Sequence, residues 1–519
     1  MIKTIDLKIP HDKVYDDEFI KKQCVKKFNI QENKIKYIEK LRESLDARKK
    51  DIKVVLRLNI YINEDYIPEE TIKSYYRDIN NSKKIIIVGA GPAGYFAALE
   101  LIELGFKPII FERGKDVQSR RVDLRQIQQY GVVNPNSNYC FGEGGAGTYS
   151  DGKLYTRSTK RGDVKKVLKI LVEHGAKPEI LYQAHPHIGS NKLPVVVKNI
   201  RETILENGGE VHFESLVTDF IIKDETILGV IVNNEKEYLG ESVILATGHS
   251  SRDIFNLLHD KNIDIDFKPF AIGVRIEHNQ KLIDDIQYGE DIRDDYLPAS
   301  SYSLVTQADN RGVFSFCMCP GGFIVPSATA PNEIVLNGMS LSRRDSKYAN
   351  SGIVVAIEKE DVIQYEKYGA LAGLKYQQEV EQNVFNFGDK KSQKAPAQRM
   401  VDFINNKISD SLPNTSYIPG IYSAPLNEVL PKNISERLRL GLINFGQMMK
   451  GYLTENANLI AVESRTSSPV KIPRDFNNLM HIKIKNLYPC GEGAGYAGGI
   501  VSAAIDGQNV AKAISRKLL

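Results

Sequence analysis

A chain of 519 residues is longer than one ordinary domain, so two or three domains are expected. Apolar residues make up 42% and charged residues 26% of the sequence, which is close to globular averages and argues against wholesale disorder. The formal net charge is only +4, with acids and bases mixed along the chain, and this balance does not indicate a nucleic-acid or membrane-surface protein.

The sequence gives no sign of export or membrane insertion. The first residues lack an apolar segment followed by a small-residue cleavage site. The most apolar stretches, such as 85–88 and 243–246, have the length of a strand and are far shorter than the roughly 18–20 residues of a membrane span. The five cysteines are an odd set without the density of a disulfide scaffold. We therefore expect a cytoplasmic protein with reduced thiols and no membrane span.

Residues 1–81 predict a small α+β module of ferredoxin-like size, which ends in a linker at 66–82. A basic turn at 47–51 is interpreted as a solvated loop, with a phosphate or polyanion site as the alternative. The elements expected in this module are a strand at 5–9, a helix at 16–28, and strands at 35–45 and 54–62.

A dinucleotide-binding turn is predicted next, at 89–94. A buried strand leads into G-x-G-x-x-G and a helix, and a second strand ends in an acidic residue. In such a unit the first glycine permits a tight turn, the second lets the backbone approach a diphosphate, and the third lets the helix pack closely on the strand. The helix N-terminus offers N–H groups to the phosphates, and the acidic residue accepts hydrogen bonds from the ribose. The residues predicted to bind here are Gly89, Ala90, Gly91, Pro92, Ala93, Gly94 and Glu112.

Three further segments favour FAD over NAD. Segment 211–219 resembles the strand pair that brings a backbone amide to the adenine in two-dinucleotide-binding flavoproteins. Segment 243–248 resembles their A-T-G signature, and 487–494 resembles their second flavin motif, in which an acidic residue meets the ribityl chain. That residue is usually Asp and is Glu492 here. The positions implied by these resemblances are Val217, Ala246, Thr247, Gly248, Gly491 and Glu492, with Gly498, Gly499 and Ile500 opening a last helix toward the flavin.

The order of these segments predicts a split nucleotide-binding domain. Strands and helices alternate through 82–267, whereas 268–475 contains short strands, Gly and Pro punctuation, and one helical stretch at 361–384. From 476 to 519 the chain returns to strand, glycine-rich turn and helix. The predicted fold class is α/β, with a Rossmann-type FAD-binding domain split by an antiparallel α+β substrate domain and preceded by the small module. A second G-x-G-x-x-G between 248 and 486 is missing, so NAD(P)H as a reductant would dock only transiently.

Several ordered motifs run through nearly the whole chain, at 44–50, 141–154, 186–189, 248–253, 317–322, 337–340 and 491–499. Together they resemble a bacterial family of uncharacterised FAD-dependent dehydrogenases. The resemblance implies FAD as cofactor and oxidoreductase chemistry, and it implies no particular substrate.

The glycine-rich loop at 142–154 is a further candidate for cofactor binding. Its backbone N–H groups can face the diphosphate and the flavin, and its polar side chains can bond phosphate or ring oxygens; an ordinary glycine-rich turn is the alternative. Arg113 and Arg121 are weaker candidates for phosphate contacts, because a surface arginine fits these positions equally well. The residues predicted from the loop are Gly145, Ala146, Gly147, Thr148, Ser150 and Lys153.

Two thiols are the first candidates for catalysis. Cys317 and Cys319 follow a strand-like run at 312–316 and precede a Pro-Gly-Gly bend. A thiol near a flavin can form an adduct, transfer electrons or ionise beside a positive charge. A disulfide across one residue of a strand is strained, however, and buried cysteines are often inert. Two thiols are also too few to bind a metal ion, so no metal site is predicted.

Histidines are the second candidates. His249 directly follows the A-T-G signature, and His187 lies in a His-Pro-His-Ile-Gly turn. Imidazole titrates near working pH, so either can act as a general acid or base, although a histidine that only holds a loop is commoner. The pair Arg343 and Arg344 can hold an anionic substrate or pair at the surface.

The leading hypothesis is an FAD-dependent oxidoreductase that passes hydride through the flavin to or from a small-molecule substrate. An RNA-associated flavoenzyme is the first alternative, but the near-neutral charge and the lack of a basic stripe make a nucleic-acid partner unlikely. A non-catalytic flavin-binding sensor or scaffold is the second. No oligomeric state is predicted.

Overall fold

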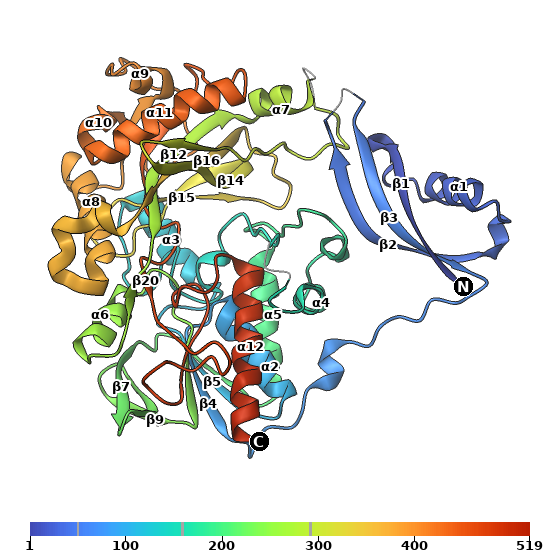
Figure 1. The fold of residues 1–519 in the computed structure, drawn as a ribbon, viewed down its shortest axis with the longest axis horizontal. Helices are drawn as coiled ribbons and strands as arrows, with labels where there is room; N and C mark the ends of the chain where they lie inside the picture. Colours follow the sequence, from blue (N-terminus) through green and yellow to red (C-terminus); the bar gives the residue numbers. More distant parts are fainter. Residues whose placement is uncertain (49–50, 157–159, 290–292) are drawn as a thin grey trace.

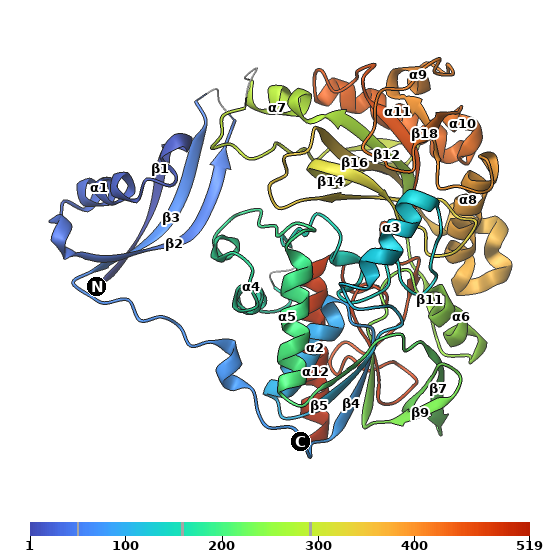
Figure 2. The same cartoon turned by 180° about the vertical axis from the view of Figure 1, so that it is seen from behind.

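A computed structural model describes residues 1–48, 51–156, 160–289 and 293–519 (Figure 1). The N-terminal module stands beside the body of the molecule, to which an extended linker joins it. The body has two layers: a parallel sheet with its helices, and a large, mainly antiparallel sheet with helices on its outer side (Figure 2).

The N-terminal module buries one face of a three-stranded sheet beneath a single long helix. Alternate residues of its central strand, from Val54 to Ile62, are buried, as the period of two in a half-buried strand requires. Asp16 caps the helix by accepting a hydrogen bond from the Phe19 N–H at 2.8 Å. The strands and helix predicted here are confirmed: β1 (Ile2–Pro10), α1 (Asp17–Phe28), β2 (Ile35–Asp46) and β3 (Lys53–Ile62), in the spatial order β1-β3-β2.

The module contacts the body at the far end of β2. Glu43 exchanges backbone hydrogen bonds with the loop at 182–184: its N–H donates to the Tyr182 carbonyl at 2.8 Å, and its carbonyl accepts from the Ala184 N–H at 2.9 Å. The linker contains the short helix η3 (Ile72–Tyr75). Ile67, which lies in the linker before this helix, is 85% exposed. Lys49 and Lys50 of the predicted basic turn lie outside the described residues.

The parallel sheet forms the lower layer of the body. Its first helix, α2 (Pro92–Glu103), is apolar almost all round because it lies between the sheet and the last helix, α12 (Ile500–Leu518). A Cβ at Gly507 of α12 would lie 2.1 Å from the Ala93 carbonyl oxygen, so only glycine permits this approach. The strands in spatial order are β21 (Leu487–Pro489), β10 (Ser242–Leu245), β4 (Lys84–Val88), β5 (Lys107–Phe111) and β6 (Glu210–His212).

A second set of elements surrounds this sheet. A small antiparallel sheet packs through apolar side chains with β4, β5 and β10. Its strands are β7 (Val217–Lys223), β8 (Thr226–Val232) and β9 (Lys236–Leu239), and the helices of this part are α3 (Arg120–Tyr130), α4 (Val164–Glu173), α5 (Leu193–Glu206) and α6 (Arg252–Asp260).

The large sheet forms the upper layer. Its central strand β12 is buried along nearly its whole length because it lies between two neighbours and beneath helices. The main path of the sheet is β13 (Val305–Ala308), β14 (Arg311–Pro326), β16 (Tyr348–Ile357), β12 (Phe270–Asn279), β19 (Asn458–Glu463), β17 (Ala395–Arg399) and β18 (Ile421–Ser423), with β15 (Leu336–Ser340) beside β14. Its helices are α7 (Gln280–Tyr288), α8 (Ala372–Phe387), α9 (Met400–Ile404), α10 (Leu426–Val429) and α11 (Lys432–Met448).

The split α/β fold is confirmed, because β21 returns to the parallel sheet and pairs with β10. The exact limits of the predicted domains stay predictions. Two expectations were wrong in detail. The helical stretch at 361–384 is interrupted at Gly369, whose φ of 55° and ψ of −125° are not helical, so a 3-10 segment precedes α8. β14 does not end before Pro320; it continues through the Pro-Gly-Gly run with two shifts of register.

Among the described helices, none combines the length and the apolar character that crossing a membrane requires.

Candidate functional site

The turn after β4 is held by close backbone contacts. Gly89 has a φ of 106°, and a Cβ there would lie 2.4 Å from the Ala246 carbonyl oxygen. A Cβ at Gly94 would lie 2.0 Å from the Gly89 carbonyl oxygen. These glycines therefore bring the start of α2 against the turn and against the end of β10, where its backbone N–H groups can bind an anion.

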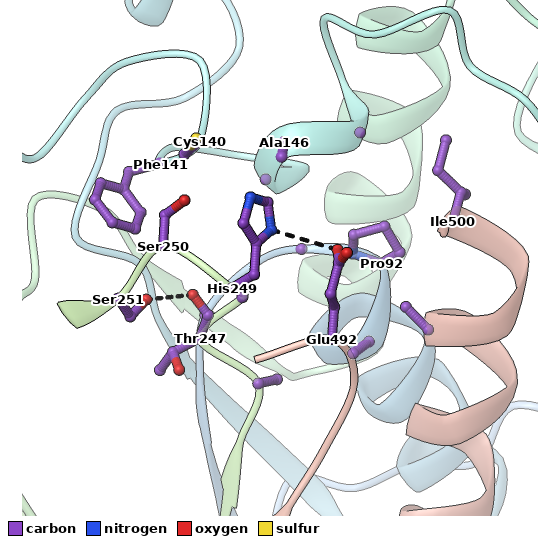
Figure 3. A pocket seen from close by; sticks show the side chains of 18 of the residues that line it. Pro92, Cys140, Phe141, Ala146, Thr247, His249, Ser250, Ser251, Glu492 and Ile500 are labelled. Atoms are coloured by element: carbon purple, nitrogen blue, oxygen red, sulfur yellow. Dashed lines mark hydrogen bonds and ion pairs between the residues drawn. The ribbon is translucent and has the colours of Figure 1, made fainter. Parts of the chain in front are cut away.

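The carboxyl ends of the parallel strands open into a cavity of about 390 Å³ between the two layers (Figure 3). Glycines, small side chains and a few polar groups form most of its wall. The residues of the wall that the sequence predicted are Gly89, Gly91, Pro92, Ala93, Glu112, Arg113, Gly145, Ala146, Gly147, Ser150, Lys153, Val217, Ala246, Thr247, Gly248, His249, Cys317, Glu492, Gly498, Gly499 and Ile500.

The other predicted residues lie outside this wall and several support it. The Ala90 N–H donates to Glu112 at 2.9 Å, the Thr148 hydroxyl donates to the Glu143 carbonyl at 3.0 Å, and the Gly491 N–H donates to Asp506 at 2.8 Å. The predicted residues outside the wall are Ala90, Gly94, Arg121, Thr148, His187, Cys319 and Gly491. Their direct contact with a cofactor stays a prediction.

Glu112 ties three loops together at one end of the cavity. Its carboxylate accepts hydrogen bonds at 2.9 Å from the N–H groups of Ala90, Gly114 and Gly142. Because a carboxylate offers about four lone-pair sites, acceptor capacity remains for a ribose hydroxyl. The ribose contact itself stays a prediction.

The wall has the features that a dinucleotide needs. A Cβ built at Gly248, Gly498 or Gly499 would meet no atom of the described residues within 4 Å, so these glycines border open space. The Thr247 hydroxyl is buried and has no hydrogen-bond partner among the described residues, as expected of a group that awaits a polar ligand. The residues present therefore fit FAD.

Cys140, which was not among the residues predicted from the sequence, lies in the wall with His249. The Cys140 thiol and the His249 ring shift each other's pKa. His249 Nδ1 lies 3.4 Å from Glu492 Oε2 (Figure 3). Burial would lower the pKa of His249, but the Glu492 carboxylate and the thiol raise it to about 10. Burial would raise the pKa of Cys140, but His249 and the Arg465 guanidinium lower it to about 6. The three side chains therefore form a chain from thiolate to imidazolium to carboxylate.

Cys317 and Cys319, called the thiol pair below, lie beside two cations. Lys153 Nζ lies 3.9 Å from the Cys317 sulfur and 3.7 Å from the Cys319 sulfur, and Arg275 Nη2 lies 3.6 Å from the latter. The sulfurs also interact with each other, which together with the cations holds the pKa of Cys317 well below its usual value. The same interaction and burial raise the pKa of Cys319. These effects favour a thiolate at Cys317 and a protonated thiol at Cys319.

His187 lies behind Lys153, outside the wall formed by the described residues. Its Nε2 contacts the Ser342 carbonyl oxygen at 3.1 Å, so the ring holds this loop. Burial and the charge of Arg344 lower the pKa of His187 to about 4, which keeps the ring neutral at neutral pH. Arg344 itself pairs with Asp151, with Nε at 3.1 Å from the carboxylate, whereas Arg343 is exposed.

Other wall residues missed from the sequence come from both layers. Asp151 lies within the glycine-rich loop at 142–154 and Cys140 lies two residues before it, so proximity to that loop was a usable signal. Asn337 opens the motif at 337–340, but it reaches the cavity only through folding of the large sheet. The same holds for Phe316, Arg465 and Thr466, which belong to none of the ordered motifs.

Three family models match the chain. Residues 83–282 match a model described as pyridine nucleotide-disulphide oxidoreductase, and residues 269–466 match one described as FAD-dependent protein, C-terminal domain-like. Residues 1–61 match a domain of unknown function.

The chain is similar to full-length and partial relatives. An uncharacterized protein of Clostridium beijerinckii is 42% identical, with 97% of both chains covered. A thiamine thiazole synthase of Aeropyrum pernix is 26% identical over 33% of this chain and 52% of its own. Among solved structures, CtdE in complex with FAD aligns with 13% identity and a TM-score of 0.31, covering 84% of this chain and 89% of that one.

Proposed function

Because this chain belongs to a family of FAD-dependent proteins and binds FAD, we propose that it is a dehydrogenase or reductase acting on a small-molecule substrate. Bound FAD supplies reversible two-electron chemistry, equivalent to transfer of a hydride. The protein contributes the binding, the orientation and the charges around it.

One observation carries this proposal: a single cavity joins the diphosphate-binding turn to the large sheet. Gly89 and Gly91 line the cavity from the parallel layer, and Phe316, Cys317 and Asn337 line it from the large sheet. A dinucleotide held by the turn therefore has its other end directed toward a second domain. Ligand sites commonly lie between domains and at the carboxyl ends of parallel strands, which supports a substrate site there.

Charged groups support redox chemistry at that end. Lys153 Nζ contacts Asp151 at 2.8 Å, so the ammonium is held in place beside the thiol pair. The raised pKa of His249 keeps its imidazole protonated at neutral pH, and this cation can stabilise negative charge on a neighbouring ligand. Small residues at Gly498 and Gly499 leave the approach to the start of α12 open.

The test is the colour and the reduction of the purified protein. We expect stoichiometric FAD absorbance, and anaerobic bleaching with NADH, NADPH, a dithiol or a member of a panel of oxidisable metabolites. Dithionite serves as the control that the bound flavin can be reduced. A colourless protein that takes up no added FAD would overturn the proposal. Bound FAD that dithionite reduces, but that no physiological reductant in the panel reduces, would also overturn it.

A further inference from the structure

The thiol pair occupies an irregular part of β14 rather than a regular strand. Cys317 has a φ of 44°, in the left-handed region that a cysteine seldom adopts, and the pairing register with β16 shifts between Phe316 and Cys319. This bulge changes the relation of positions i and i+2, so the two sulfurs come close enough to interact. Backbone strain of this kind is concentrated at functional sites.

The surroundings of the pair leave at least one positive charge uncompensated by carboxylates. Lys153, Arg275 and Arg344 contribute three cations. Asp151 pairs with Lys153 and Arg344, and Glu463 pairs with Arg275 at 2.8 Å. Burial raises the pKa of Glu463 to about 7, so at neutral pH these carboxylates offset the three cations only in part. A negative charge on the thiol pair reduces the remaining excess of positive charge. The cations therefore favour the ionised, reduced form of the pair, in which Cys317 is a nucleophile.

The other buried cysteines have no such surroundings. Burial raises the pKa of Cys24 to about 11, and burial also raises the pKa of Cys490. These are the expected properties of inert core thiols. The thiol pair differs from them because Lys153 and Arg275 lie within 3.9 Å of its sulfurs, and because Cys317 borders the cavity while Cys319 is fully buried behind it.

We propose that Cys317 and Cys319 are a redox-active dithiol that exchanges two electrons with FAD and closes to an intramolecular disulfide. The inference rests on the proposed function, because FAD is the electron partner. In this scheme the dithiol holds two electrons in addition to those held by the flavin. It passes them between the cofactor and an external reductant or acceptor.

The Cys317 thiolate and the Cys319 thiol form one S–S bond while the S–H bond of Cys319 breaks. Two electrons and one proton leave the pair, and together they are the hydride equivalent that oxidised FAD accepts. In the reverse direction, two electrons and one proton from reduced FAD open the disulfide and restore the thiolate. Lys153 and Arg275 stabilise the thiolate of the reduced pair, from which the forward reaction starts and which the reverse reaction restores.

Anaerobic titration of the oxidised, FAD-loaded protein with dithionite tests the inference. We expect the wild type to take up about four electrons per FAD, and Cys317→Ser and Cys319→Ser to take up about two. Cys24→Ser is the matched control, because it removes a buried thiol in the N-terminal module, away from the cavity, and it should keep the value of about four.

A second measurement uses the wild-type protein alone, so it does not depend on whether a cysteine variant folds. Alkylation followed by mass spectrometry should show the peptide that carries both cysteines as an unlabelled disulfide before reduction. After reduction, both cysteines of that peptide should carry the label. Uptake of about two electrons by wild-type protein, with both thiols free throughout, would overturn the inference while leaving the FAD enzyme intact. A protein that binds no FAD would overturn the proposed function instead, and with it this electron exchange.

Discussion

At the scale of single residues, the contact between Cys140 and His249 has a direct chemical consequence. The lowered pKa of the thiol and the raised pKa of the imidazole mean that the thiolate–imidazolium pair prevails between about pH 6 and pH 10. An ordinary cysteine becomes a thiolate only near pH 8.5. Because the thiolate is the nucleophile, alkylation reports the difference.

We predict that iodoacetamide labels Cys140 in the FAD-free protein with a midpoint near pH 6. His249→Gln should move this midpoint upward by more than about one pH unit, because the cationic partner is lost. The midpoint is measured by mass spectrometry of the labelled peptide. Cys490 in the same digest is the internal control, since its raised pKa should keep it unlabelled. A midpoint near 8.5 for wild-type Cys140 would contradict the assignment.

Glycines in the cavity wall allow a sharper test of where FAD lies. A methyl group at Gly498 meets no described atom within 4 Å, so Gly498→Ala should fold with an unchanged melting temperature. We predict at least a tenfold loss of FAD affinity, equal to about 1.4 kcal/mol, because the methyl group occupies cofactor space. Gly312→Ala, which lies in β14 with its nearest atoms at 4.0 Å, is the matched control and should bind FAD normally. Unchanged affinity in Gly498→Ala would place the cofactor elsewhere.

At the scale of elements, a buried ion cluster joins α6 to the helices and strands of the large sheet. Arg252 contacts Glu333 and Glu381 at 2.7 Å each, and Arg465 contacts the same two carboxylates at 3.1 and 2.9 Å. Both carboxylates are fully buried. Burial and the charge of Glu381 raise the pKa of Glu333 to about 7, and the two arginines hold the pKa of Glu381 low against burial.

We predict that Arg252→Met destabilises the protein by about 3 kcal/mol, because it leaves two buried carboxylates with one cation. The folded-state pKa of Glu333 already exceeds its unfolded value of about 4.5, so this group favours folding at low pH and loses that contribution as the pH rises through about 7. Losing Arg252 raises this pKa further. The drop in melting temperature should therefore be larger at pH 8 than at pH 5.5.

Arg57→Met serves as the control for that measurement, since it breaks an exposed pair with Asp6 and should change the melting temperature little at either pH. An equal drop for both variants would contradict the view that burial makes the α6 cluster important.

Elements with a clean local signal were predicted well from the sequence. β3 alternates, α1 has an acidic cap, and the turn at 89–94 has its three glycines in the required spacing. The signal fails where long-range packing decides. Gly369 breaks a segment whose composition is helical, and the bulge at Cys317 depends on pairing with β16, which the local sequence does not encode.

At the scale of the whole molecule, the N-terminal module is separable from the cavity. All described residues of the cavity wall lie at position 88 or beyond, whereas the module contacts the body elsewhere, through the backbone of Glu43 and through an apolar cluster of Ile52 with Tyr288 and Leu297. The candidate site could be predicted only in part, because its wall combines segments that are far apart in the sequence. Arg465 and Cys140 reach one wall from distant parts of the chain, and neither belongs to a motif of known spacing.

Limited proteolysis should therefore cut first within residues 63–71, where Ile67 is 85% exposed. We predict that the nicked protein keeps its FAD and its flavin absorbance after gel filtration. Parallel loss of FAD and of the intact chain would contradict the separation of module and site. The uncut protein incubated without protease is the control.

The return of the chain to the parallel sheet also has a consequence for biosynthesis. β21 completes the edge of that sheet next to β10, and the segment from Glu492 to Ile500 supplies one side of the cavity. While a ribosome is still translating the large sheet, the first glycine turn is already made but the pocket has no second side. Cofactor capture is therefore a late, post-assembly event, and nascent chains that stall within the inserted domain should remain without FAD however much of it the cell provides.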